Sequence, residues 1–564
     1  HLFPSLGPAR AGGGGVAGGG AFPPPPPPLP PPPPPPPPPP HFSPTGPLMS
    51  SPPTPRPSHF RYVILGLLCL LAMITYMDRA ANGSARDAIM GDLNAQVPKE
   101  KWQYAKEGKF SDDALGGLMG GVAIPAQPRV QPYDKNDFFL VLMAFQLAYA
   151  IFEVPSGWLG DTRGPRQTLL RVVIWWSAFV FLTGFVGMTL LPEAVVGGIF
   201  VGFYALLVIQ FLFGVGEAGA FPNISKALYN WFPANARGFA KSAIWMSARL
   251  MGGLTPLVWV LLTEWKVGGM NLDSGLTWRG AMWLFAIVAA VWAAIFYFTF
   301  TNNPSDHRGV NAEELARINA GREGGNKAVR VPWGKLLRSR NLWAVCGMYV
   351  VTNFCWYFLM YNHPRSMGEQ FGQWKTTGDG RALLAVLSGS PLLIGMLGCF
   401  LGGVWSDWLI RKTGSRKWAR RIPGMVGYGM AGVCYLAALG GKMIDPTNLW
   451  AYAVPLMLMG FFNDLIMAPS WAVCQDIGRQ YAATVSGAMN MVGNLLGAVS
   501  GIFVTGMIEK ANQVDKLNEA GEKVGTMLSM TGYTVLFGLY AAVYFAGVAL
   551  WLLIDANKPV VEEE

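Results

Sequence analysis

Long apolar runs recur along the chain and are separated by polar segments. Each run has about 20 residues, enough to cross the roughly 30 Å hydrocarbon layer of a bilayer as an α-helix. Inside lipid a helix satisfies its own backbone hydrogen bonds, whereas an open sheet cannot. We therefore predict an all-α membrane protein with twelve spanning helices, near residues 61–81, 138–158, 168–191, 197–222, 238–262, 280–301, 341–362, 383–405, 422–440, 447–468, 483–508 and 531–554.

The polar segments divide these helices into two groups of six. The first six-helix bundle is expected at 58–301, with an insertion on the outer side at 92–137. A basic central linker at 302–340 leads to the second bundle at 341–555, and an acidic tail follows at 556–564.

The N-terminal segment, residues 1–57, is a Gly tract followed by a long Pro run. Such a composition cannot bury a core, so we expect disorder or extended polyproline, with an SH3-type ligand as the alternative. A compact polar leader begins at Met49. We interpret residues 1–48 as a gene-model artefact.

Composition supports the membrane assignment. Hydrophobic residues make up 51% of the chain and charged residues only 13%, about half the charge of soluble domains. The net charge of +10 lies mainly in alternate loops, whereas the short loop around Pro192 has no basic residue. This is the positive-inside pattern, which places both termini in the cytoplasm and gives no reason for a nucleic-acid partner. The alternative is that the basic loops are plain solvated surface.

The six cysteines and the known catalytic motifs point away from an enzyme. No cysteine has a neighbour at metal-ligand spacing, so we interpret all six as small apolar filler. The sequence contains no G-x-x-x-x-G-K-[ST] and no H-E-x-x-H. We therefore predict no catalytic residues, no metal and no cofactor. The cysteines are Cys69, Cys346, Cys355, Cys399, Cys434 and Cys474.

A repeated loop links the two halves. "GWLGDTRGPR" (157–166) follows the second run of the first half, and "GVWSDWLIRKTGSR" (403–416) follows the second run of the second half. Matched halves suggest a transporter whose site lies where the halves meet. We predict that Asp161 and Asp407 form a latch of ion pairs and helix termini, with an ordinary charged loop as the alternative. The candidate gating residues are Gly157, Asp161, Arg163, Gly164, Arg166, Gly403, Asp407, Arg411, Gly414 and Arg416.

Both loops resemble the G-x-x-x-D-R/K-x-G-R/K signature, and the chain resembles the major facilitator superfamily. It is most similar to the anion:cation symporter family, carriers of sugar acids and other organic anions. The resemblance covers about residues 58–555 and implies a fold of two pseudo-symmetric six-helix bundles. Four further stretches carry it, "RYVILGLLCLLAMITYMDRA" (61–80), "GEAGAFPNISKALYNWFPANARGFA" (216–240), "AVLSGSPLLIGMLGCFLGGVWSD" (385–407) and "SGAMNMVGNLLGAVSG" (486–501).

Asp78 and Arg79 follow about 16 apolar residues, or roughly 24 Å of helix. A charged side chain at the bilayer centre costs about 2.5–3.5 kcal/mol, so it normally faces a partner or water. The plain interpretation is a charge pair at the outer interface. The resemblance implies instead that both line the central cavity, Asp78 as a proton-coupling site and Arg79 as a contact to the substrate anion.

Glu217 lies in a literal G-x-G-x-x-G, Gly214 to Gly219. A dinucleotide site would need a preceding strand and an acidic residue about 20 positions on, but no acidic residue occurs between Ala218 and Thr263. The glycines instead predict close helix packing. The resemblance implies that Glu217 is the second proton-binding carboxylate, with a structural hydrogen-bonded glutamate as the alternative.

The chain departs from the family pattern at three positions. Gln210 stands where relatives usually carry an arginine, and Glu153, in Y-x-x-x-E-x-P from Tyr149, adds a third candidate proton-coupling carboxylate. We hypothesise that Arg249 restores the cation missing at Gln210; a neutral or zwitterionic solute is the alternative. The candidate substrate-binding residues are Tyr76, Arg79, Tyr149, Gln210, Arg249, Asn490 and Asn494, the asparagines because "NMVGN" matches a family motif. Asn353, Asn362, His363 and Asn463 are weaker candidates, since buried asparagines also join helices.

These features together predict a monomeric secondary transporter in the inner membrane. The expected reaction is proton-coupled uptake of a small organic anion by alternating access. The resemblance implies a sugar acid such as a hexuronate, aldonate or aldarate. An anion exchanger or exporter of the same fold, and a transport-silent nutrient receptor, remain as alternatives.

Overall fold

The computed structural model describes residues 56–95, 135–186, 195–196, 199–263, 276–320, 331–358, 363–371, 378–517 and 523–561. Several expectations fall outside these ranges. They concern the N-terminal segment up to residue 55, most of the 92–137 insertion, residues 321–330 of the linker, Asn362 and the end of the acidic tail.

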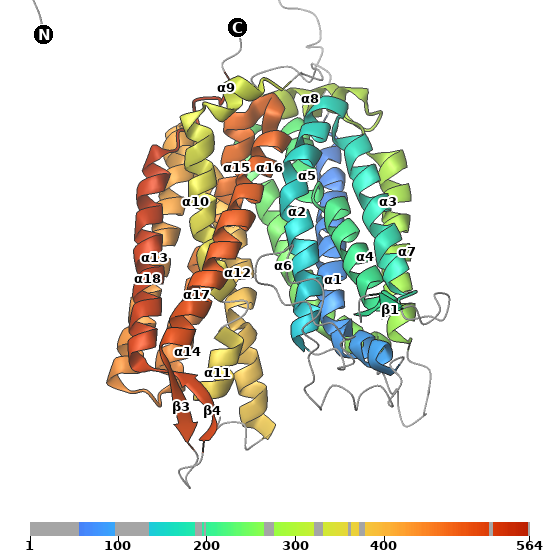
Figure 1. Cartoon of the computed structure of the whole chain (residues 1–564). Coiled ribbons are helices and arrows are strands. Elements are labelled where there is room, and N and C mark those ends of the chain that lie inside the picture. The colour runs from blue at the N-terminus through green and yellow to red at the C-terminus, as the bar shows by residue number, and fades with distance from the viewer. Residues whose placement is uncertain are drawn as a thin grey trace, which may run out of the picture. The chain divides into compact units, whose positions relative to one another are not determined.

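The first half of the chain forms one group of helices (Figure 1). Glu217 ends one of these helices, and a break at residues 218–219 separates it from the next. The elements are α1 (Phe60–Ala95), α2 (Lys135–Arg163), α3 (Pro165–Thr183), β1 (Val195–Val196), β2 (Ile199–Phe200), α4 (Val201–Glu217), α5 (Ala220–Trp231), η3 (Ala234–Ala236), α6 (Arg237–Thr263) and α7 (Trp278–Thr299).

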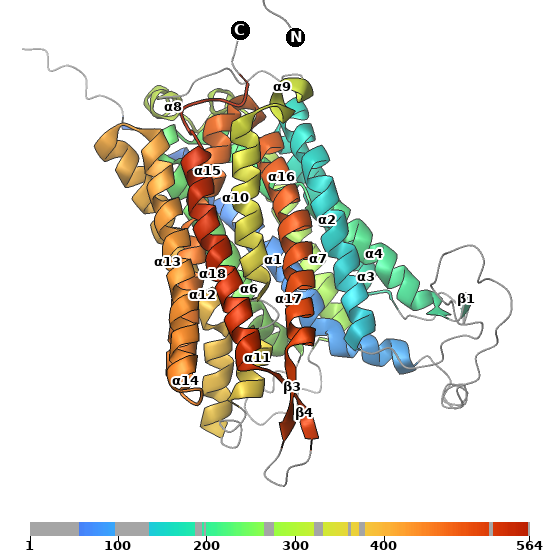
Figure 2. The same cartoon turned by 60° about the vertical axis from the view of Figure 1, so that its left-hand side comes forward.

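The second half forms a group beside the first, and the views in Figures 1 and 2 agree on this arrangement. The linker contributes η4 (Pro304–Asp306), α8 (Ala312–Asn319) and α9 (Trp333–Leu337). The other elements are α10 (Arg340–Tyr357), α11 (His363–Gln370), α12 (Gly378–Thr413), α13 (Arg416–Ile444), α14 (Leu449–Leu465), α15 (Met467–Gly478), η7 (Arg479–Tyr481), α16 (Ala482–Val492), the π-helix η8 (Gly493–Ala498), α17 (Val499–Ala511), β3 (Gln513–Leu517), β4 (Lys523–Leu528) and α18 (Met530–Leu553).

Each of the twelve expected runs overlaps one or more helices in the described residues, and the predicted fold class is confirmed. Within the described residues, eight segments are long and apolar enough to cross a membrane by length and composition. The boundaries differ most in the first run. There α1 continues to Ala95, because the residues after Asp78 are small or apolar often enough to keep one helix face buried.

The two repeated loops lie at the same end of the molecule as α8 and α9, which we call the signature end. In each loop a glycine adopts positive φ, Gly164 at 88° and Gly414 at 69°. Residues other than glycine rarely adopt a positive φ. The second glycine of each repeat therefore allows the turn between two helices.

The linker is attached to the first half by Glu314 of α8. Its carboxylate accepts hydrogen bonds from the backbone N–H groups of Phe60 (2.9 Å) and Arg61 (3.1 Å), and from the Ser58 hydroxyl. Glu314 is fully buried. A carboxylate at the N-terminus of a helix satisfies free amides and interacts favourably with the helix dipole. Therefore α8 is fixed to the start of α1.

Helices approach closely where glycines face a neighbour. A Cβ on Gly398 would lie 2.2 Å from the Phe461 carbonyl oxygen, and one on Gly402 would lie 1.8 Å from that of Leu465. Both glycines are on α12 and both carbonyls on α14, so small residues set the distance between these helices, as is common in lipid.

We predict that Gly402→Ala destabilises the protein, because the added methyl group forces α12 and α14 apart. Overpacking of this kind costs about 1–3 kcal/mol. The check is the apparent melting temperature of the detergent-solubilised protein. Gly429→Ala is the matched control, because a Cβ there meets nothing within 4 Å. A Gly402→Ala protein as stable as this control would contradict the prediction.

Candidate functional site

Asp161, at the end of α2, reaches across to the second half. Its carboxylate accepts hydrogen bonds from the backbone N–H of Ala483 (3.2 Å) and Thr484 (2.7 Å) and from the Thr484 hydroxyl (2.6 Å). These amides are in the first turn of α16, and the ammonium of Lys226 lies 3.4 Å away. Asp161 therefore caps a helix of the opposite half.

Asp407, at the equivalent place on α12, caps a helix of the first half. It accepts hydrogen bonds from the backbone N–H of Gly238 (3.1 Å) and Phe239 (2.7 Å), in the first turn of α6. The repeated loops thus make the same contact in opposite directions, and we call the pair Asp161 and Asp407 the latch. Glycines allow the helices of the two halves to approach closely at the latch. A Cβ on Gly403 would lie 2.2 Å from the Gly238 carbonyl oxygen, and one on Gly157 would lie 2.5 Å from that of Ala483.

A buried charge network extends the latch. Arg420 donates to Asp407 (3.0 Å) and to Asp476 (3.0 Å), and Asp476 also accepts from Arg237 of the first half (3.0 Å). Sequence reasoning missed Asp476. The signal was present, because "CQDIGRQ" places a carboxylate beside the apolar run of α15, where a partner is required.

The arginines of the repeated loops do not pair with the latch carboxylates in the described structure. Arg163 and Arg411 are exposed. Arg166 stays within the first half, with its guanidinium 4.9 Å from the Tyr297 ring centroid and its backbone N–H bonded to Asn302 (2.9 Å). Arg416 begins α13, after Gly414. The cations that do reach the latch, Lys226 and Arg420, come from other segments.

The ion pair between Arg79 and Glu217 lies deeper in the first half. The Arg79 Nε is 2.7 Å from the Glu217 Oε1, and the Glu217 side chain is fully buried. The guanidinium also lies over the Tyr149 ring, 4.2 Å from its centroid. The glycines around Glu217 pack against α2 and α3: a Cβ on Gly216 would lie 2.2 Å from the Trp175 ring.

Two more predicted carboxylates are buried beside this pair. Asp78 is 1% exposed; the Trp176 indole N–H lies near its carboxyl group, but neither oxygen accepts a hydrogen bond of full geometry from the described residues. Glu153, fully buried on α2, accepts from the Asn490 amide of the second half. The Asn490 amide also lies 3.4 Å from the Tyr149 hydroxyl. The site therefore joins the halves at Glu153 and Asn490.

Other predicted polar residues are engaged in contacts between helices. Gln210 donates to Asn82 (2.9 Å) and Thr183 (3.4 Å), which favours a packing role over a direct contact to solute. Asn494, in the π-helix, accepts from Asn353 (3.0 Å). His363 is fully buried, with its ring 6.2 Å from that of Tyr452.

Arg249 forms a second ion pair, and this one joins the halves. It binds Asp464 of α14 through two contacts, Nε to Oδ2 at 3.0 Å and Nη2 to Oδ1 at 3.2 Å. We call it the bridging pair. Sequence reasoning considered Asn463 and overlooked Asp464 beside it, although a carboxylate within the long apolar run of α14 was the available signal.

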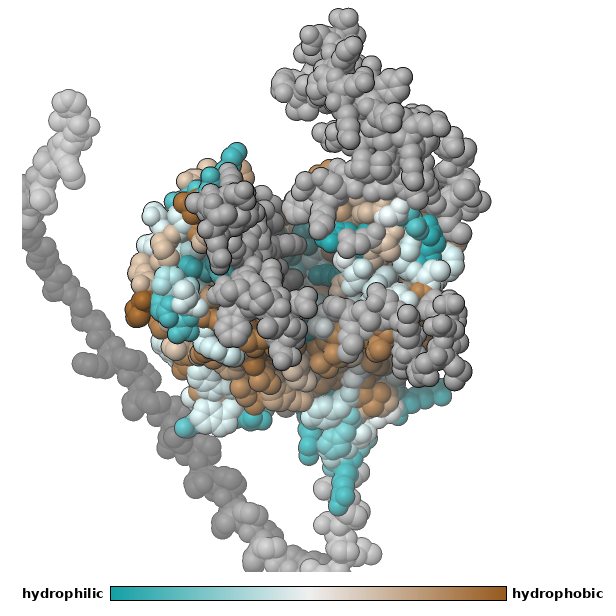
Figure 3. Space-filling view, turned by 90° about the horizontal axis from the view of Figure 1, so that it is seen from below, coloured by the Kyte–Doolittle hydropathy of each residue, from teal (hydrophilic) through white to brown (hydrophobic). Residues whose placement is uncertain are grey.

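The latch and the bridging pair join the two halves, whereas the Arg79–Glu217 pair is formed within the first half. The hydrogen bonds described between the halves are made at the signature end, by the latch, and farther into the molecule, by Glu153 and the bridging pair. Viewed from the opposite end, the surface is hollowed between the two groups of helices, and hydrophilic residues are visible inside the hollow (Figure 3). The structure is therefore closed at the signature end.

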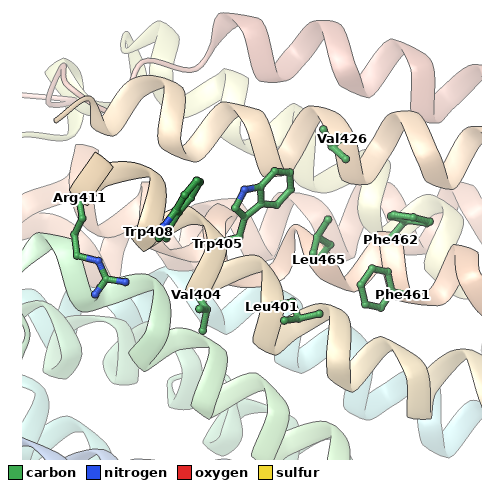
Figure 4. A pocket seen from close by; sticks show the side chains of 9 residues that line it. All are labelled: Leu401, Val404, Trp405, Trp408, Arg411, Val426, Phe461, Phe462 and Leu465. Atoms are coloured by element: carbon green, nitrogen blue, oxygen red, sulfur yellow. The ribbon is translucent and has the colours of Figure 1, made fainter. Parts of the chain in front are cut away.

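An apolar groove of about 460 Å³ lies elsewhere, on an outer face formed by α12, α13 and α14. Its residues include Leu401, Trp405, Trp408 and Arg411 (Figure 4). Leu401 is 47% and Trp408 45% exposed. Such a surface suits contact with lipid, and none of the buried ion pairs opens into it.

Comparisons with known proteins settle the family. The sequence profile described as Major Facilitator Superfamily matches residues 68–501. The chain belongs to the Major Facilitator Superfamily. Its fold is also that of the solved proton:xylose symporter XylE, with a TM-score of 0.56 at 14% identity, covering 88% of this chain and 95% of that one. The family consists of transporters, so the prediction of a non-enzyme is confirmed.

Three curated members of the superfamily are similar along most of their length. The probable sulfoacetate transporter SauU of Cupriavidus necator is 28% identical, over 81% of this chain and 89% of its own. The probable galactarate/D-glucarate transporter GudP of Escherichia coli is 28% identical, over 72% and 82%. The hexuronate transporter of Bacillus subtilis is 24% identical, over 75% and 91%. The predicted resemblance to carriers of organic anions agrees with these names.

We predict that Asp161→Asn loosens the latch. The neutral amide loses the charge-assisted bonds to the α16 amides, which are worth about 1–2 kcal/mol at a helix N-terminus. In hydrogen-exchange mass spectrometry, the peptide containing Ala483 and Thr484 should exchange faster than in the native protein. Asp306→Asn, at an exposed site of the linker, is the control. Unchanged exchange at α16 would show that Asp161 does not hold the halves together.

Proposed function

We propose that this member of the superfamily takes up a small organic anion together with protons, by alternating access. The observation that carries the proposal is the buried ion pair between Arg79 and Glu217, with Asp78 next to it and without a bonded donor. A permanent cation held by a carboxylate gives one residue that can bind an anion and another that can bind a proton. The names of the relatives support a sugar acid or a similar acid.

The cycle starts from the arrangement closed at the signature end. The anion approaches Arg79 from the hollow at the opposite end and displaces the Glu217 carboxylate. Glu217 then takes up a proton, because an unpaired buried carboxylate is costly. The loaded pocket is close to neutral, so it can close around the solute at low electrostatic cost.

Opening at the signature end requires Asp161 and Asp407 to leave the helix termini that they cap. The halves then rock about the bound solute, as in other carriers built from two repeats. Release of the anion lets Arg79 return to Glu217, which loses its proton. The proton gradient thereby drives uptake, by about 1.4 kcal/mol for each pH unit and proton.

We further propose that the protein acts as a monomer in the inner membrane, with the signature end in the cytoplasm. Support comes from the basic residues gathered in the loops at this end, such as Arg163, Arg411 and Lys412, since cytoplasmic loops are enriched in Lys and Arg.

We predict that Glu217→Gln uncouples uptake from the pH gradient, because the amide cannot carry a proton. In proteoliposomes loaded at higher internal pH, uptake of a sugar acid should fall at least about 10-fold, as the loss of one proton at one pH unit implies. Exchange of internal for external solute should persist, since it needs no net proton movement. The panel of solutes to be tested in this assay consists of galactarate, galacturonate and galactonate.

The control for this experiment is Asp92→Asn, which alters the ion pair between Asp92, in the last turn of α1, and Arg279. Its uptake should respond to the gradient as the native protein does. Uptake by native protein that ignores the gradient would reject symport and favour exchange. Binding of solute without any flux would favour a receptor.

A further inference from the structure

The bridging pair has the geometry of a second anion-binding point; the sequence pointed to Arg249 but not to its partner Asp464. Arg249 comes from α6 in the first half and Asp464 from α14 in the second. Their two contacts form the fork-to-carboxylate geometry in which an arginine recognises an acidic group. The same geometry would suit a carboxylate or sulfonate of a solute.

The surroundings of the bridging pair keep it dry and oriented. The Arg249 side chain is 8% exposed and that of Asp464 is fully buried. The guanidinium lies over the Trp356 ring, 4.0 Å from its centroid. Asn463 donates to Asp464 (3.1 Å), and a Cβ on Gly395 would lie 2.6 Å from the Asp464 carboxylate. Charges held this way need a partner at every step of a cycle.

Tyr76 connects the bridging pair with the ion pair of the first half. Its ring centroid lies 5.6 Å from the Arg79 guanidinium. A Cβ on Gly252, about one turn along α6 from Arg249, would lie 3.0 Å from the Tyr76 ring. Tyr76 therefore contacts Arg79 and packs against the helix that carries Arg249.

We propose that the transported solute carries two acidic groups, one bound by Arg79 and the other by Arg249. This rests on the proposed function and specifies its substrate class as a dianion. When each acid group replaces Glu217 or Asp464, the displaced carboxylate takes up one proton. Two protons then balance the two negative charges, and the loaded pocket carries the same net charge as the empty one.

The panel of galactarate, galacturonate and galactonate tests the proposal, because the three acids have the same number of carbon atoms. Galactarate has two carboxylates, whereas galacturonate and galactonate have one each. In proteoliposomes, galactarate should have a half-saturation concentration at least about 10-fold lower than the two monoacids, as expected for one more charge-assisted contact. Arg249→Gln should raise that of galactarate about 10-fold or more and leave the monoacids within about 2-fold.

Asp464→Asn tests the second proton. It should still bind galactarate, because Arg249 remains. With the membrane potential clamped at zero, the pH gradient that stops net flux against a fixed galactarate gradient gives the coupling ratio, which should fall from two protons for each galactarate to one. Arg279→Gln, at the partly exposed pair with Asp92, should leave affinity and ratio unchanged. The double variant Arg249→Gln/Asp464→Asn replaces the pair with two neutral amides and shows by its monodispersity whether loss of the charges alone unfolds the protein.

The outcomes separate this proposal from the function that it refines. Proton-driven uptake of the monoacids without uptake of galactarate would overturn the two-point proposal and leave symport standing. Arg249→Gln weakening all three acids equally would also overturn it. If none of the acids entered with protons, the proposed function would fail, and the dianion proposal with it.

Discussion

Two buried carboxylates, each capping a helix of the opposite half, hold the structure in the form that it adopts. Asp161 accepts the free amides of α16, and Asp407 those of α6. A helix terminus buried without partners would be costly, so the capping contact and the closed signature end depend on each other. Both capped helices also carry groups of the central site, Asn490 and Arg249. The contacts that close one end therefore also position the residues in the middle.

In the central site each buried arginine has a carboxylate partner. Arg79 has Glu217, and Arg249 has Asp464. Among the described residues of the site, Asp78 and Glu153 have no ion-pair partner: Glu153 accepts from the neutral Asn490 amide, and neither oxygen of Asp78 has a bonded donor. A buried carboxyl without an opposite charge is costly to keep ionised.

Hydropathy, motif spacing and the family resemblance predicted the fold, both members of the Arg79–Glu217 pair and Arg249 of the bridging pair, but not its partner Asp464. The twelve apolar runs, the repeated loops and the residues Arg79, Glu217 and Arg249 were all visible in the sequence. Asp464 and Asp476 were not singled out, because pairing between segments more than 200 residues apart depends on how two bundles dock. Sequence period says nothing of that docking. The role of Gln210 was likewise decided by neighbours on α1 and α3.

The attachment of Glu314 to the start of α1 has a mechanical consequence. Two backbone N–H groups at the start of α1 donate hydrogen bonds to this buried carboxylate. We therefore expect α8 to move together with the first half. The Asn341 amide binds the backbone carbonyls of Asp555 and Lys558, so the second half carries its own end of the connection. Rotation of one half against the other therefore leaves α8 on the first half and Asn341 on the C-terminal end of the second half, provided that these contacts persist.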